Sequence, residues 1–147
     1  MQTLLLILVS LATQPDRAFP LSVPVRHSPT VADARGILVQ LQNAIRANDH
    51  RRIAALIQFP LGVRKGKLAP TYVPSVKVFM RTHALVFTRR VSNAILAEDP
   101  ASLALRDGLV RIGGGAAAIG LRCESVERAT CRAGVVWVSI IDDPSVP

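Results

Sequence analysis

The sequence predicts an α+β domain in which N-terminal helices pack on a curved antiparallel sheet. Between residues 30 and 96, apart from residues 61–73, apolar residues recur every three or four positions, which is typical of amphipathic helices. In the last third, apolar runs alternate with turn residues, which is typical of neighbouring strands joined by tight turns. Both patterns fall within residues 30–147, so we expect a single domain there.

The composition predicts a small, basic domain with a real core. Half of the 147 residues are hydrophobic and 19% are charged, which opposes intrinsic disorder. The net charge is +8, because 18 Lys and Arg stand against 10 Asp and Glu. Two cysteines are too few for a disulfide-built miniprotein or for a four-thiolate zinc site. The three histidines show no metal-ligand spacing with each other or with a cysteine, so we expect no metal and no cofactor.

The chain opens on a short apolar run, residues 4–11, which has the length of a signal-peptide core rather than of a membrane span. Ala12 and Ala18 are small residues at which a signal peptidase cleaves, so residues 1–18 are predicted to be a signal peptide. No Lys or Arg precedes the run, and the alternative is an apolar first element that packs on the domain. Residues 19–29 are proline-rich and are predicted to be an extended leader. We therefore expect a periplasmic or secreted protein without a membrane span in its mature chain.

Helices are predicted from caps and apolar spacing. Thr30 is the expected N-cap of the first helix, and Asp49 caps a shorter second helix that Pro60 ends. Ser75 begins a third helix, and Thr88 caps its continuation to residue 96. The expected apolar face of the third helix consists of Val76, Phe79, Met80, His83 and Phe87.

Strands are predicted around turn residues. Residues 61–73 form a hairpin with Gly66 at its turn, and Pro70 restricts the second arm to a sheet edge. Residues 103–106 and 109–112 are joined by Asp107-Gly108, a strong turn signal. Residues 113–115 are three glycines, and we expect a bend there that curves the sheet.

Two further strands, residues 116–123 and 131–141, complete the predicted sheet. The last strand is apolar on both faces and is expected to be central. Strict alternation places Val135 and Trp137 on one of its faces and Val138 on the other.

The two cysteines lie beside these last strands. Cys123 and Cys131 are predicted to form a disulfide across a hairpin, which an oxidising compartment would preserve. In the cytosol the same pair would be two buried thiols. The predicted signal peptide and the predicted disulfide support each other.

Three short motifs stand out, at residues 59–64 (FPLGVR), 86–91 (VFTRRV) and 106–113 (RDGLVRIG). Together with the two late cysteines, they resemble motifs of small exported bacterial proteins in the nuclear transport factor 2-like superfamily. The resemblance covers residues 30–141 and implies a cone-like fold, in which helices pack inside a curved sheet. Enzymes of this superfamily, the ketosteroid isomerases among them, use a pocket Asp and a Tyr or protonated acid. No residue here is assigned to those roles, because Asp107 is explained by its turn.

The helical face and the strand alternation predict the lining of a pocket. The expected lining residues are Phe79, His83, Phe87, Leu109, Arg111 and Trp137. His83 is the one weak catalytic candidate, because a neutral imidazole in a pocket can act as a general base. The alternative is a structural histidine bonded to a backbone carbonyl.

We therefore expect a binding or structural domain for a small apolar or amphipathic ligand, or for a protein partner. One alternative is an isomerase- or hydrolase-like enzyme using His83. Another is a basic surface adaptor for an anionic partner, because Arg and Lys cluster at residues 51–52, 64–67 and 89–90. A homodimer through the sheet is also expected. Nucleic acid is disfavoured, since the chain has few aromatic residues and no recognised nucleic-acid module.

Overall fold

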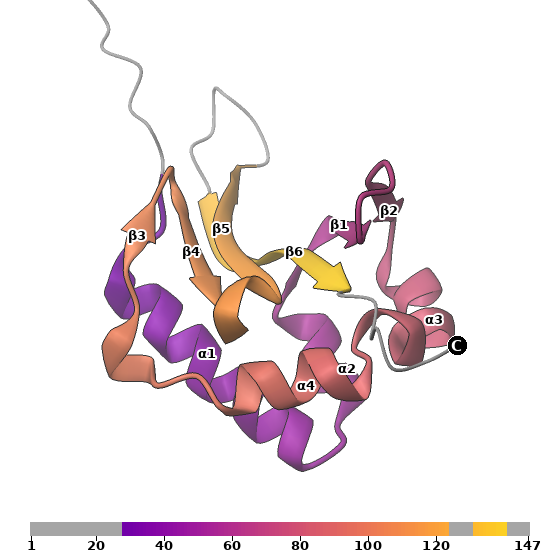
Figure 1. Ribbon diagram of the computed structural model, residues 1–147, viewed down its shortest axis with the longest axis horizontal. Coiled ribbons are helices and arrows are strands. Elements are labelled where there is room, and N and C mark those ends of the chain that lie inside the picture. The colour runs from indigo at the N-terminus through magenta and orange to yellow at the C-terminus, as the bar shows by residue number, and fades with distance from the viewer. Residues whose placement is uncertain (1–27, 124–130, 141–147) are drawn as a thin grey trace, which may run out of the picture.

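The computed structural model describes residues 28–123 and 131–140, and Figure 1 shows their arrangement. The helices are α1 (Val31–Arg46), α2 (His50–Ala55), α3 (Val76–Val86) and α4 (Arg89–Leu96), with short 3-10 turns η1 (Pro100–Ser102) and η2 (Gly113–Gly115). The strands are β1 (Ile57–Lys65), β2 (Thr71–Val73), β3 (Leu105–Arg106), β4 (Leu109–Ile112), β5 (Ala117–Cys123) and β6 (Cys131–Ile140). The predicted α+β class is confirmed. The predicted signal peptide lies outside the described residues, as does the leader except for Ser28 and Pro29.

The six strands form one sheet in the order β2-β1-β6-β5-β4-β3. The last long strand, β6, lies between β1 and β5, so its central position is confirmed. Every neighbouring pair is antiparallel except β1 and β6, which are parallel. The sheet is therefore mixed rather than antiparallel throughout. A tight turn imposes antiparallel pairing, and no turn joins β1 to β6, because the chain between them passes through β2, α3, α4 and the rest of the sheet.

The core lies between the helices and one face of the sheet. Figure 1 shows α1 and α4 together on one side of the sheet and α3 beside the β1–β2 hairpin. The caps form as the sequence predicts, since the hydroxyl of Thr30 accepts a hydrogen bond from the Asp33 backbone N–H and those of Ser75 and Thr88 cap α3 and α4. The largest fully buried side chains are Phe79, Leu38, Leu41, Leu61, Ile95, Ile112 and Ile119.

One buried polar side chain connects α1 to the end of α4. Gln42 is only 6% exposed, and its amide nitrogen donates to the carbonyl oxygens of Ile95 at 3.0 Å and Glu98 at 2.8 Å. The Glu98 carboxylate in turn accepts from the backbone N–H of Gly113 at 2.7 Å. The Gln42 bonds join α1 to the C-terminal end of α4, and the Glu98 carboxylate holds η2 against that end.

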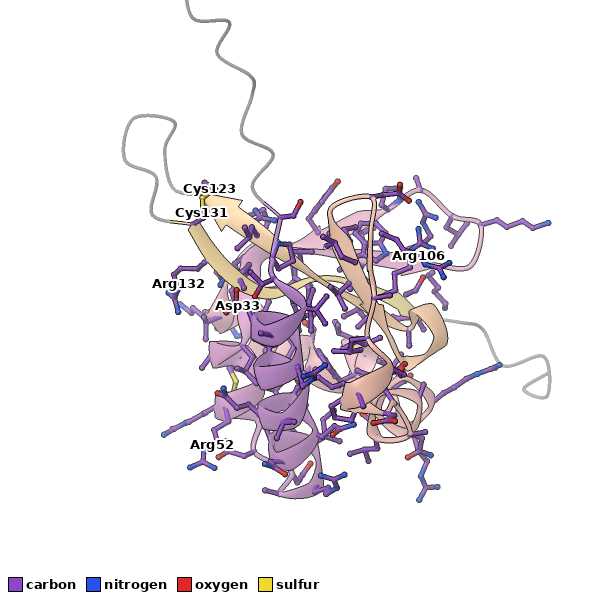
Figure 2. The ribbon with its side chains drawn as sticks, turned by 90° about the vertical axis from the view of Figure 1, so that its left-hand side faces the viewer. Asp33, Arg52, Arg106, Cys123, Cys131 and Arg132 are labelled. Atoms are coloured by element: carbon purple, nitrogen blue, oxygen red, sulfur yellow. A yellow bond between two sulfur atoms is a disulfide. The ribbon has the colours of Figure 1, made fainter. Side chains whose placement is uncertain are left out.

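The predicted disulfide between Cys123 and Cys131 is confirmed. The two residues are directly paired at one end of β5 and β6, with Cα atoms 4.0 Å apart. Figure 2 shows their sulfur atoms at this end of the sheet, with Arg132 beside them. The turn predicted between the two strands lies outside the described residues.

The prediction that Pro60 ends the second helix is wrong. Helix α2 ends at Ala55, and β1 begins at Ile57, so Pro60 lies within a strand. It falls between Ile57 and Gly62, where the register of β1 against β6 shifts, and a residue without an N–H is tolerated at such an irregularity. The guanidinium of Arg122 donates to the Pro60 carbonyl oxygen at 2.9 Å.

Strict alternation along the last strand is also wrong. Val135 and Val138 are both fully buried in the core, although the alternation places them on opposite faces. In β5, Ala118 pairs with Trp137 and the next residue, Ile119, pairs with Val135. Val136 is therefore an extra residue in β6. A bulge of this kind reverses the alternation beyond it. Trp137 therefore lies on the sheet face that points away from the core.

Candidate binding groove

An open groove of about 980 Å³ lies between the β1–β2 hairpin and the helices α3 and α4. We call it the hairpin groove. Its volume is at the upper end of the range that is typical of small-molecule sites. Its apolar walls include Leu68, Tyr72, Val78, Leu85, Val86 and Ile140.

The local sequence keeps this groove open. Pro70 and Pro74 flank β2 and limit it to three residues, and β1 is the one described strand with which β2 pairs. Ser75 then caps α3 directly after the strand, with its hydroxyl 3.5 Å from the Val78 backbone nitrogen. The chain therefore turns from an edge strand into a helix, with the groove between them.

The groove contains unusually exposed apolar side chains. Leu85 is 70% exposed, Leu68 66% and Tyr72 63%, which makes them the three most exposed large hydrophobic residues in the part of the chain that the structure describes. All three line the hairpin groove, although they come from α3, the hairpin turn and β2. Single exposed apolar residues are ordinary, whereas a cluster facing one hollow is typical of an interaction site.

The charged residues that line the groove are all cationic. Lys65, Arg89 and Arg90 contribute to it, and the described lining contains no Asp or Glu. Arg89 is the first residue of α4, where the backbone N–H groups of the helix also favour negative charge. The groove therefore combines an apolar wall with a cationic side chain, Arg89, at the start of α4.

Three of the six predicted pocket residues pack together away from this groove. Phe79 is fully buried and contacts the rings of Phe59 and Phe87 edge-on, with centroids 6.2 Å and 5.9 Å apart. His83 is half-buried, and its Nδ1 lies 3.1 Å from the carbonyl oxygen of Met80. This contact to a backbone carbonyl agrees with the structural interpretation of His83, and its use as a catalyst stays a prediction.

The other three predicted residues, Leu109, Arg111 and Trp137, line a second hollow of about 350 Å³ on the outer face of the sheet. The six residues thus fall into two groups that share no cavity among the described residues. The hairpin groove itself was missed by sequence reasoning, because helical periodicity selects buried positions. The sequence feature that could have indicated the groove is the presence of Leu85 and Tyr72, two large apolar residues outside the predicted apolar faces.

Sequence spacing also missed a histidine pair. The rings of His50 and His83, which come from α2 and α3, lie with centroids 3.7 Å apart. Within residues 28–123 and 131–140, no three His, Cys, Asp or Glu side chains gather as a metal site would require.

No helix in the described part of the chain has both the length and the apolar character needed to cross a membrane. The chain has no significant match among protein-family models, curated proteins or solved structures. Its function must therefore be inferred from the geometry of its own surfaces.

Proposed function

We propose that this protein binds an amphipathic anion in the hairpin groove, with an apolar chain on the groove wall and an acidic head near the start of α4. The observation that carries the proposal is the convergence of Leu68, Tyr72 and Leu85, all exposed, on one cationic hollow. Such a ligand matches both the apolar wall and the positive charge.

The apolar wall supplies most of the binding free energy. Covering the exposed parts of three large apolar side chains contributes roughly 3–5 kcal/mol, from which the entropy cost of association must be subtracted. A charge-assisted hydrogen bond donated by Arg89 then favours an acidic head over a neutral one. A neutral molecule with the same chain should therefore bind more weakly.

Replacing Leu85 with aspartate tests the groove directly. The change places a carboxylate on the apolar wall at a side chain that is 70% exposed, so the fold is retained while the groove is altered. We expect dodecanoate, measured by isothermal titration calorimetry, to bind at least about tenfold more weakly to Leu85→Asp. Val39→Asp is the matched control, because Val39 is an exposed apolar residue of α1 that does not line the groove.

The acidic head is tested by comparing dodecanoate with dodecanol on the unaltered protein and on Arg89→Gln. The unaltered protein should prefer dodecanoate, and Arg89→Gln should reduce that preference. Equal loss of dodecanoate binding in Leu85→Asp and Val39→Asp would place the ligand elsewhere. The absence of saturable heat for either probe would refute the proposal.

We also propose that the protein is exported and that residues 1–18 are removed as a signal peptide. The disulfide between Cys123 and Cys131 supports this proposal, because such bonds persist mainly in oxidising compartments. Mass spectrometry of the protein recovered from the periplasm should give a mass that lacks residues 1–12 or 1–18 and the two thiol hydrogens. A full-length, reduced chain in the cytosol would contradict export.

Membership of the nuclear transport factor 2-like superfamily is proposed from the motif resemblance together with the order of the elements. The order α1-α2-β1-β2-α3-α4 followed by the remaining strands supports it. An experimental structure tests it, because membership requires the sheet to curl around the helices as a cone. A flat sheet would count against it.

A further inference from the structure

A second hollow lies on the sheet face that points away from the core. We call it the sheet-face hollow and define it by Arg64, Leu109, Arg111, Trp137 and Ser139, which line its volume of about 350 Å³. It is separate from the hairpin groove, with which it shares no lining residue.

Sheet register places these side chains together. Gly62, Trp137, Ala118 and Arg111 are successive partners across β1, β6, β5 and β4, so they form one row on the outer face. The small residues of this row leave room for the large ones. Gly62 accommodates the indole ring of Trp137, and Ala118 forms the floor between the indole and Arg111.

The two arginines of the hollow present open donors. The guanidinium carbon of Arg64 lies 5.4 Å from the centroid of the Trp137 ring, within cation–π range. No hydrogen bond or ion pair joins the Arg64 side chain to any described residue, so its N–H groups can donate to a carboxylate. Arg111 is exposed and has neither a hydrogen bond nor an ion pair with any described residue. No Asp or Glu is among the described residues that line the hollow.

We propose that the sheet-face hollow binds a small planar aromatic carboxylate. The flat indole and Leu109 provide an apolar surface for a ring, and the arginines provide donors for its carboxylate. The volume is at the lower end of the range for ligand sites, which suits a molecule of one or two rings.

A second copy of this chain fits the same face poorly. A twofold dimer brings a surface patch against itself, so Arg64 and Arg111 of one copy would face those of the other. Among the described residues that line the hollow, none carries a carboxylate that would neutralise them. The charges therefore favour an anionic ligand over self-association at this face.

The single tryptophan makes the proposal measurable without a label. Trp137 is the only Trp of the chain, so the one indole N–H signal in a proton–nitrogen NMR spectrum of the mature protein reports on this hollow. Titration with benzoate should shift that signal and saturate below about 10 mM. Benzamide, which has the same shape without the charge, should bind at least about fivefold more weakly.

Arginine variants identify the groups that bind the probe. Arg111→Gln and Arg64→Gln should each weaken benzoate binding about tenfold, whereas Arg132→Gln should change it less than about twofold. Arg132 is the matched control because it is an arginine on β6, the strand that carries Trp137, and lies beside the disulfide and outside the hollow (Figure 2). Leu85→Asp should leave benzoate binding unchanged, which separates this site from the hairpin groove.

Three results would overturn the proposal. One is equal affinity for benzoate and benzamide, and another is unchanged affinity in both Arg64→Gln and Arg111→Gln. The third is an indole signal that responds to protein concentration and not to benzoate, because a second copy would then cover this face. Circular dichroism of each variant confirms that lost binding is not lost folding.

Discussion

Replacing Phe79 with alanine is expected to lower the free energy of unfolding by about 3–5 kcal/mol. Phe79 is fully buried and makes edge-to-face ring contacts with both Phe59 and Phe87. Removing its ring leaves a cavity between α3 and β1 that the neighbouring side chains fill only in part. The loss is a large share of the stability of a domain of this size.

Chemical denaturation followed by circular dichroism measures this effect. Leu85→Ala is the matched control on the same helix, and it should change stability by less than about 0.5 kcal/mol because Leu85 is 70% exposed. Comparing Phe79→Ala with Leu85→Ala also distinguishes a core role of Phe79 from the pocket-lining role that its helical face predicts. A loss below about 1 kcal/mol in Phe79→Ala would show that the ring borders open space.

Replacing Gly62 with alanine is expected to lower the free energy of unfolding by about 1–3 kcal/mol. A Cβ atom at this position would overlap the indole ring of Trp137, which lies directly above it on the sheet. Either the ring leaves its place or β1 and β6 move apart. Trp137 fluorescence should therefore shift to longer wavelength as the indole becomes more exposed to water.

Gly36→Ala is the control for this prediction. Gly36 lies within α1, and a Cβ there would meet no atom within 4 Å. Alanine favours a helix over glycine by about 0.5–1 kcal/mol, so this variant should be as stable as the unaltered protein or more so. If both glycine variants respond alike, Trp137 does not pack on Gly62 as described.

Local signals in the sequence were sufficient for three helix starts and for one tight turn. The capping side chains of Thr30, Ser75 and Thr88 begin their helices, because each hydroxyl satisfies a backbone N–H at a helix start. Asp107 and Gly108 form their tight turn with φ of 53° and 77°, a conformation that Asp and Gly tolerate. These interactions span only a few residues, so they are visible without knowledge of the fold.

Pairing between distant segments was not visible in this way. The bulge at Val136 depends on which residues of β5 face β6, and it moved Trp137 to the outer face. Pro60 was tolerated in β1 only because the register against β6 shifts there. Both deviations arise from contacts between strands that are far apart in the sequence.

The candidate site shows the same division. The sequence by itself determined the α+β class, the caps, the turns and the cysteine pair, because each depends on local geometry or on residue type. Only the tertiary structure decided that Leu68, Tyr72 and Leu85 share one groove and that Arg64 and Arg111 flank one tryptophan. A binding surface forms where segments distant in the chain become neighbours, and the strand order and register that make them neighbours depend on the packing of the whole domain.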